Sequence, residues 1–92
     1  MSRGKFITVE GIEGVGKSTN IEVLVRSIEA AGHKVLTTRE PGGTPLAEDI
    51  RHIVQHRGDE PIPEIAELLL IFAARSLNVN NVIIPALEAG TW

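Results

Sequence analysis

Eight residues near the amino terminus match a phosphate-binding pattern at each of its fixed positions. Residues 11–18 read Gly-Ile-Glu-Gly-Val-Gly-Lys-Ser, which fits G-x-x-x-x-G-K-[ST]. Glycines let successive backbone N–H groups turn toward one phosphate, and the helix that follows points its positive end at the same anion. Lys17 then reaches the β- and γ-phosphates, and the Ser18 hydroxyl binds Mg²⁺. The predicted nucleoside triphosphate site consists of Gly11, Ile12, Glu13, Gly14, Val15, Gly16, Lys17, Ser18 and Thr19.

The residues around this loop predict the strand and the helix that such a loop requires. Residues 5–9 are strand formers directly before the loop, and apolar residues recur at helical spacing over 21–28. Gly32 stands where helices commonly end, and residues 35–38 read as a second strand. A strand–helix–strand unit needs a parallel pair. The expected fold class is therefore α/β, a P-loop NTPase-type parallel sheet flanked by helices; the alternative is a glycine-rich turn that binds nothing.

Two further helices are expected after the second strand. Thr44 and Pro45 suit the N-cap and the first residue of a helix. A third helix runs from about Glu64 into Leu77. Residues 68–74 are apolar nearly all round this helix, so we expect it to be buried on most sides.

The last part of the chain predicts a helix that is interrupted and then stops. Apolar residues continue at helical spacing over 79–87, and Pro85 should kink this stretch or mark a restart. Residues 88–90, Glu-Ala-Gly, indicate a helix end. Thr91 and Trp92 read as the start of another strand.

Composition narrows the function classes. The net charge is −3 with no block of like charges, so neither nucleic acid nor a membrane surface is an expected partner. The chain has no cysteine, and His33, His52 and His56 are too scattered for a metal site. No apolar run approaches the roughly 20 residues of a membrane span. A cytoplasmic protein is expected.

The 92 residues allow at most one small domain, and only three of them are aromatic, so the core should be thin. Two strands offer too little sheet to cover such apolar helices. The loop also lacks a second acidic Mg²⁺ partner on a later strand. We therefore expect the chain to be the amino-terminal part of a longer protein.

Four blocks of the chain together resemble bacterial thymidylate kinases. They are residues 6–19, residues 38–44 (Thr-Arg-Glu-Pro-Gly-Gly-Thr), residues 69–75 (Leu-Leu-Ile-Phe-Ala-Ala-Arg) and residues 82–87. The resemblance implies transfer of the ATP γ-phosphoryl group to dTMP, giving dTDP and ADP. It also implies that residues 1–92 are the amino-terminal part of a single P-loop nucleoside monophosphate kinase domain, truncated after Trp92. The implied cofactors are ATP and Mg²⁺, the second substrate is dTMP, and the full-length protein is expected to be a homodimer.

The resemblance assigns roles to residues in the first half of the chain. Lys17 and Glu13 match catalytic residues, and the Glu13 carboxylate also faces the deoxyribose of the acceptor. Arg39, Glu40 and Pro41 match the block that borders the pocket for the acceptor nucleotide. Arg51 matches a helix arginine near the acceptor, although a solvated arginine on a polar helix face would look the same.

Arg75 and Phe72 are the candidate residues on the third helix. Arg75 follows seven apolar residues, and a buried cation needs an anionic or hydrogen-bonding partner. The resemblance implies that the matching arginine bonds the thymine or a nearby ligand atom; the alternative is an arginine on the helix surface with its stem along apolar neighbours. Phe72 lies three residues earlier, on the same helix face, and is a candidate to stack on the pyrimidine. Many relatives have this aromatic residue where the chain has Ile71, so Ile71 and Phe72 both remain candidates.

Residues 76–78, Ser-Leu-Asn, depart from the Ala-Gln-His of many relatives, so part of the acceptor pocket is altered. The Asp-Arg pair, the lid and the adenine-binding segment of the family would lie beyond Trp92, so residues 1–92 alone are expected to be inactive. The alternatives are another P-loop nucleotide kinase and a non-catalytic remnant that binds phosphate or nucleotide.

Overall fold

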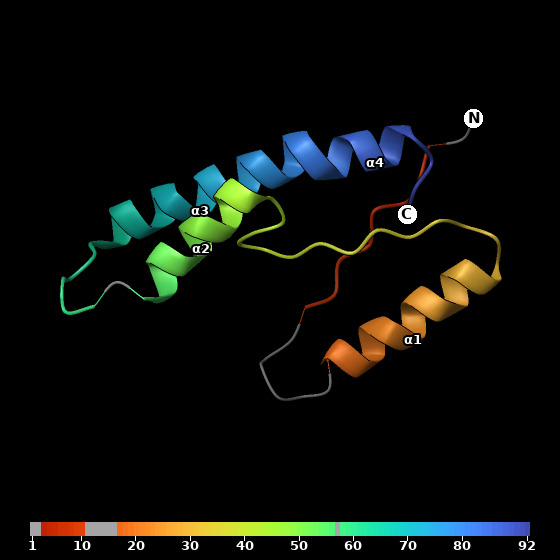
Figure 1. Cartoon of the computed structure of the whole chain (residues 1–92), viewed down its shortest axis with the longest axis horizontal. Coiled ribbons are helices and arrows are strands. Elements are labelled where there is room, and N and C mark those ends of the chain that lie inside the picture. The colour runs from red at the N-terminus through yellow and green to blue at the C-terminus, as the bar shows by residue number, and fades with distance from the viewer. Residues whose placement is uncertain (1–2, 11–16, 57) are drawn as a thin grey trace. The chain divides into compact units, whose positions relative to one another are not determined.

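The computed structural model describes residues 3–10, 17–56 and 58–92, with the side chains of residues 17 and 18 left out. The described residues form five helical elements, four of which are labelled in Figure 1. They are α1 (Lys17–Ala30), α2 (Pro45–Gln55), α3 (Glu64–Asn78), the π-helical turn η1 (Val79–Ile83) and α4 (Ile84–Glu88). The chain divides into two compact units, Met1–Leu36 with Ala86–Trp92, and Thr37–Pro85.

In the first unit, α1 ends at the glycine that the sequence indicates. Gly32 has a φ of 95°, a left-handed conformation that favours glycine. Its N–H donates to the Glu29 carbonyl at 2.9 Å, and the His33 N–H donates to the Ile28 carbonyl at 3.3 Å. These two bonds form a Schellman motif, which satisfies carbonyls left over at a helix end. The predicted helix and its end are both confirmed.

The expected strands do not form in the part of the chain that the structure describes. Phe6 and Ile7 are 59% and 46% exposed, because no neighbouring strand covers them. One contact of the expected kind is present: the Trp92 N–H donates to the Lys34 carbonyl, and the Leu36 N–H donates to the Trp92 carbonyl, each at 2.8 Å. Parallel strands pair in this alternating way. These two hydrogen bonds join Trp92 to residues 34–36, but no strand forms at either segment, so the sheet stays a prediction.

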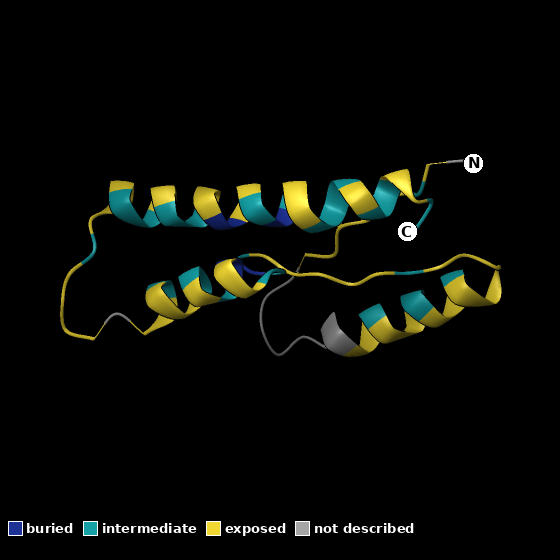
Figure 2. Cartoon of the chain, turned by 45° about the horizontal axis from the view of Figure 1, so that its top comes forward, coloured by how far each residue is buried: buried dark blue, intermediate teal, exposed yellow. Residues whose placement is uncertain are grey.

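In the second unit, α2 and α3 pack side by side (Figures 1 and 2). The N-cap prediction for α2 is confirmed, because the Thr44 hydroxyl accepts a hydrogen bond from the Ala47 N–H at 3.0 Å and Pro45 is the first helical residue. Ala47 of α2 and Ala74 of α3 are fully buried. Small side chains at these positions leave room for the two helices to approach.

The expectation that α3 is buried on most sides is wrong for this chain. Ile65 and Leu69 are each 65% exposed, and Phe72 is 53% exposed. Within the described residues α2 is the neighbouring helix, and it covers one face only.

The helical stretch Glu64–Glu88 has the length and the apolar composition of a membrane span. Among the described residues it is the one stretch that does, and the signal is weak, because core helices of soluble proteins share both properties.

The helical stretch continues through Pro85 without a break, so the predicted restart does not occur, and the alternative, a kink, stays a prediction. Proline has no N–H to donate within a helix. Just before it, the Ile84 N–H donates to the Val79 carbonyl, five residues back, and α4 begins at Ile84. A second glycine then ends α4: Gly90 has a φ of 85°, and the Thr91 N–H donates to the Ala86 carbonyl at 2.9 Å.

Candidate functional site

The phosphate-binding loop lies mostly outside the described residues. This applies to Gly11, Ile12, Glu13, Gly14, Val15 and Gly16, and to the side chains of Lys17 and Ser18. The backbone of α1 begins at Lys17, and Thr19 is exposed in its first turn. The helix therefore starts where the pattern requires one, and the site at this loop stays a prediction.

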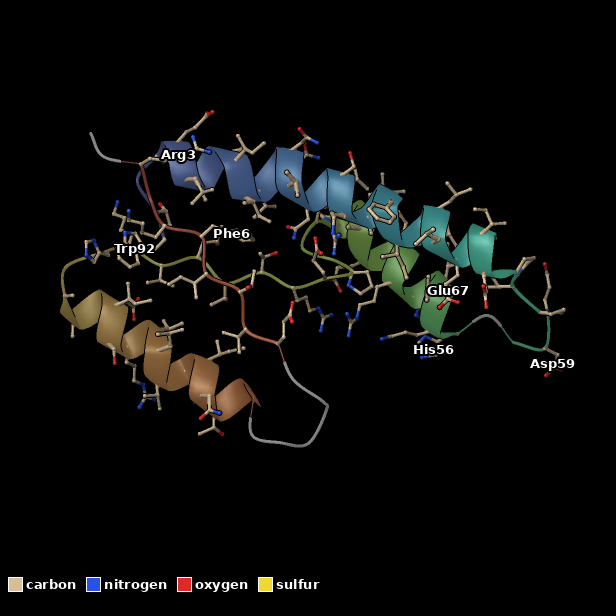
Figure 3. All side chains as sticks on the ribbon, turned by 180° about the vertical axis from the view of Figure 1, so that it is seen from behind. Arg3, Phe6, His56, Asp59, Glu67 and Trp92 are labelled. Carbon is tan, nitrogen blue, oxygen red and sulfur yellow. The ribbon has the colours of Figure 1, made fainter. Side chains whose placement is uncertain are left out.

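A second group of candidate residues lies within one compact unit, Thr37–Pro85. It comprises Arg39, Glu40, Pro41, Arg51, Phe72 and Arg75. The first three belong to the loop before α2, which has a cis peptide bond between Glu40 and Pro41. Arg51 lies on α2 and the last two lie on α3. Figure 3 shows the side chains of this helix pair, with His56 and Glu67 marking the end where α2 stops and α3 starts.

Arg75 pairs with a loop residue that the sequence also singles out. Its Nε–H donates to the Glu40 carboxylate at 2.8 Å. The Arg75 side chain is 52% exposed, so the expectation of a buried cation is wrong, while the expected need for an anionic partner is met. Within the described residues the two terminal nitrogens of Arg75 make no hydrogen bond. They are free to donate to a ligand.

Phe72 lies beside Arg75 on the same face of α3, as the spacing of three residues predicts. The guanidinium carbon of Arg75 is 5.4 Å from the centroid of the Phe72 ring, within the range of a cation–π interaction. Phe72 is 53% exposed, whereas Ile71 is half-buried. Phe72 is therefore an accessible aromatic surface next to a cation, and which of the two residues faces a base stays a prediction.

Arg51 links α2 to the loop. Its Nη1 donates to the Pro41 carbonyl at 3.0 Å, and the residue is half-buried. Pro41 follows Glu40 directly in the chain, so Arg51 holds the backbone next to the residue that binds Arg75. A freely solvated arginine does not describe this position.

Arg39 pairs with Glu48, a residue that the sequence analysis missed. The Nε and Nη2 of Arg39 donate to the Glu48 carboxylate at 3.2 and 2.6 Å. The Gly43 N–H donates to the same carboxylate at 2.9 Å. These contacts, first the side-chain bond from Arg39 and then the backbone bond from Gly43, lower the pKa of Glu48 to about 2. An acidic residue in the first turn of a helix after a conspicuous loop is the signal that could have pointed to Glu48.

Asn78 is a second residue whose contacts the sequence did not predict. It is fully buried, and its Oδ1 accepts a hydrogen bond from the Thr38 hydroxyl at 2.9 Å. Its Nδ2 is buried without a partner among the described residues. In the sequence, Asn78 stands out only as a departure from relatives. The sequence around it gave no signal, because residues 75, 76, 80 and 81 are polar as well.

The arrangement joins the loop, α2 and α3 through side chains. Arg39, Arg51 and Arg75 stand with two carboxylates, those of Glu40 and Glu48, which leaves one positive charge in excess. An exposed ring lies at the same place. Such a group suits an anionic ligand with a flat ring. No group of three metal-binding side chains occurs in the part of the chain that the structure describes.

Comparison with known proteins gives the family. The family described as "Thymidylate kinase" matches residues 9–92. The chain belongs to the thymidylate kinase family. Membership in this family implies the P-loop NTPase fold, in agreement with the loop at residues 11–18.

Three curated thymidylate kinases are similar to the chain over nearly all of its length. The protein of Haemophilus ducreyi is 52% identical over 91 residues, that of Teredinibacter turnerae 51% over 89, and that of Alteromonas mediterranea 54% over 90. These matches cover 97–98% of the chain but 42%, 43% and 40% of the relatives. The chain spans about two fifths of the length of the curated relatives it matches.

Proposed function

We propose that this chain provides the ATP loop and the acceptor-binding surface of a thymidylate kinase, which transfers the ATP γ-phosphoryl group to dTMP and releases dTDP and ADP. The observation that supports this function best is the single connected group formed by the 38–44 loop, α2 and α3. Residues 1–92 are then part of one nucleoside monophosphate kinase domain with its parallel sheet.

Residues of α3 bind the thymine base and fix its orientation. Phe72 offers its exposed ring to the thymine, and Arg75 donates to a thymine oxygen through its free terminal nitrogens. Glu40 binds the Nε edge of Arg75 and so fixes the plane of the guanidinium. A fixed donor loses less conformational entropy on binding than a mobile one.

The phosphate of dTMP carries the charge that Arg39 and Arg51 complement. Both are tied by one edge, Arg39 to Glu48 and Arg51 to the Pro41 carbonyl, and each keeps further N–H groups for an anion. Phosphoryl transfer depends mostly on positioning and electrostatic stabilisation. Arginines whose side chains are held by a second contact can keep the phosphate of dTMP in one position.

The ATP side of the reaction belongs to the loop at residues 11–18. Lys17 would bind the β- and γ-phosphates, with the loop backbone and Thr19 around them, and Glu13 would face the deoxyribose of the acceptor. A hydroxyl oxygen suits Mg²⁺, which prefers oxygen ligands, so Ser18 would hold the ion. When bound, Mg²⁺ neutralises charge that develops on the phosphates.

We further propose that the full-length protein is a homodimer in the cytoplasm and that it binds neither nucleic acid nor a membrane. The apolar side chains exposed on α3, such as Ile65 and Leu69, favour burial against another part of the protein.

The deciding experiment supplies the missing length from a relative. Residues 1–92 are joined to the rest of the Haemophilus ducreyi thymidylate kinase, which the chain matches at 52% identity. ADP formation is then measured with dTMP, dUMP, dCMP, AMP and GMP. Preference for dTMP is expected. Preference for another monophosphate would support a different nucleotide kinase, and binding of ATP without turnover would support the non-catalytic alternative.

A further inference from the structure

The glycine pair of the 38–44 loop lies between polar side chains from two helices. A Cβ atom on Gly42 would collide with the Glu48 carboxylate of α2. A Cβ atom on Gly43 would collide with the Asn78 amide oxygen of α3 and with the Thr38 hydroxyl. Both glycines have left-handed φ values, 143° and 95°. The loop backbone is therefore held closely from both helices.

Glu48 holds the loop from the α2 side at two separate points. Its carboxylate binds Arg39 through the Nε and Nη2 edge and also accepts the Gly43 N–H. Arg39 and Gly43 flank the segment that contains Glu40. Because Glu48 occupies one edge of the Arg39 guanidinium, the Nη1 group stays without a hydrogen bond in the described part of the chain. That group has a fixed direction.

Asn78 holds the loop from the α3 side at its beginning. Its amide oxygen accepts the Thr38 hydroxyl, one residue before Arg39. Asn78 has no exposed surface, so it does not contact a ligand in solvent, and its effect on the loop passes through Thr38 and Gly43.

We propose that Glu48 and Asn78 are positioning residues that fix the 38–44 loop in the shape in which Arg39 and Glu40 serve the dTMP site. The inference rests on the proposed function and deepens it. Glu48 sets the direction of Arg39 toward the acceptor phosphate, and Asn78 fixes the start of the loop through Thr38. Neither residue contacts the acceptor itself.

A purely stabilising role for Glu48 has less support. The Arg39 side chain is 60% exposed and that of Glu48 is 37% exposed. Exposed ion pairs contribute little to folding stability, since solvent screens them. Three N–H groups nevertheless donate to the one Glu48 carboxylate and so define the position of the loop. Removing the carboxylate should therefore change the mobility of the loop and the affinity for dTMP more than it changes the free energy of unfolding.

The test compares two neighbouring charge removals in the 92-residue chain. Glu48→Gln removes the positioning carboxylate, and Asp49→Asn removes the next carboxylate, which is exposed and makes no hydrogen bond to the described residues. Binding of dTMP and of inorganic phosphate is followed by NMR titration. Glu48→Gln should raise the Kd for both by about three- to tenfold, the range for a partly exposed hydrogen bond to a charged group. Asp49→Asn should leave both Kd values unchanged.

A second readout needs no ligand. The Gly43 amide should exchange its hydrogen about two- to tenfold faster in Glu48→Gln, as expected for loss of one hydrogen bond. The thermal unfolding midpoint should stay within the range of Asp49→Asn. If Glu48 only stabilised the fold, Glu48→Gln would lower the thermal unfolding midpoint. The Gly43 amide would then exchange at nearly the same rate in Glu48→Gln and in Asp49→Asn.

The contribution of Asn78 is tested through its partner, because truncating a buried asparagine disturbs packing. Thr38→Val removes the donor at nearly constant shape, and Thr38→Ser keeps the hydroxyl. Valine should speed Gly43 exchange and weaken dTMP binding, and serine should restore both. Equal behaviour of the two substitutions would overturn the role of Asn78.

Different results would contradict the proposed dTMP kinase function and the proposed roles of Glu48 and Asn78. A wild-type chain that binds phosphate but not dTMP would contradict the proposed function, and the inference would then be decided by phosphate binding and Gly43 exchange. Unchanged Gly43 exchange in Glu48→Gln, equal effects of Glu48→Gln and Asp49→Asn, or a Glu48→Gln chain that does not fold would each overturn it.

Discussion

At the scale of single residues, the arginines of this chain differ in what holds them. Arg75 binds Glu40, Arg39 binds Glu48, and Arg51 binds a backbone carbonyl. Each contact uses one part of a guanidinium and leaves further donors for a ligand. This is the arrangement expected where a planar donor must meet a base or a phosphate at a defined angle.

Replacement of Arg75 by alanine should weaken dTMP binding much more than ATP binding. The loss of a hydrogen bond to a charged donor corresponds to a Kd for dTMP about 10- to 100-fold higher. Calorimetric titration of the chain with each nucleotide is the measurement. Arg26→Ala, on the exposed face of α1, is the matched control and should change neither Kd. Equal losses for dTMP and ATP, or loss of the fold, would assign Arg75 a structural role.

Acid should release the Glu48 contacts only at low pH. The pKa of Glu48 is lowered to about 2 by Arg39, by the Gly43 N–H and by the charge of Arg51. An unfolded chain has a glutamate pKa of about 4.3. Because the folded value is the lower one, the contribution of these contacts is complete above about pH 4.3 and is lost as the pH falls through about 2.

The measurement is a carboxyl ¹³C titration of Glu48. Arg39→Gln removes the largest cause of the shift and should move the midpoint upward. A midpoint near 4.3 in the unsubstituted chain would contradict the Arg39–Glu48 contact.

Lys17→Ala should leave the fold intact and nearly abolish turnover in the chimaera described above. Lys17 is the one side-chain cation in the loop of residues 11–18. Loss of a single electrostatic contact to a transition state costs about 10²- to 10³-fold in kcat. Steady-state kinetics and circular dichroism check the two halves of this prediction. A kcat near that of the unsubstituted chimaera would contradict the assignment of the loop.

Contacts within one helix could be predicted from the sequence at this scale, and contacts between segments could not. The spacing of three residues was enough to place Phe72 beside Arg75. The partner of Arg75 is 35 residues away in the chain, and the Thr38–Asn78 bond joins residues 40 apart. Helical periodicity contains no information about such contacts, so the roles of Glu48 and Asn78 are seen only in the structure, where the 38–44 loop, α2 and α3 lie together.

At the scale of elements, helix ends were the most predictable features. Thr44, Gly32 and Gly90 each stand where local chemistry demands them, because a cap is a property of a few consecutive residues. Strands differ, since a strand is stabilised by its neighbours. Residues 5–9 have strand-forming side chains and no described partner, and Phe6 and Ile7 remain exposed.

Thr44→Ala should destabilise the second unit by about 1 kcal/mol, the usual cost of losing an N-cap side chain. The Thr44 hydroxyl accepts the Ala47 N–H, and alanine offers no acceptor. Urea unfolding followed by helical circular dichroism measures the effect, and Thr44→Ser, which keeps the hydroxyl, should be close to the unsubstituted chain. Equal loss in both variants would contradict the capping contact.

At the scale of the whole molecule, the exposed apolar surface of α3 is the feature that most needs explaining. Ile65, Leu68, Leu69 and Phe72 are each at least 49% exposed. Their periodicity predicted burial, and among the residues that the structure describes α2 covers only one side of the helix. The prediction was wrong here because burial depends on every neighbouring element, whereas periodicity describes one helix alone.

Whether residues 1–92 act as an enzyme by themselves depends on the positive charge available to the transferring phosphoryl group. The loop of residues 11–18 contains glycine at position 14 and a single cation, Lys17. Phosphoryl transfer needs further positive charge at the transition state, and an arginine that supplies it contributes about 10³- to 10⁵-fold in kcat. The arginines of the 38–44 loop, α2 and α3 are tied to Glu48, to the Pro41 carbonyl and to Glu40 in positions that suit the acceptor. We therefore expect the 92-residue chain to bind dTMP without measurable turnover, while the chimaera with the rest of a relative turns it over at about 1–100 s⁻¹, the range of ordinary kinases. Coupled detection of ADP in both proteins is the measurement. Turnover by residues 1–92 alone at the rate of the chimaera would show that the described arginines already meet the charge of the transition state.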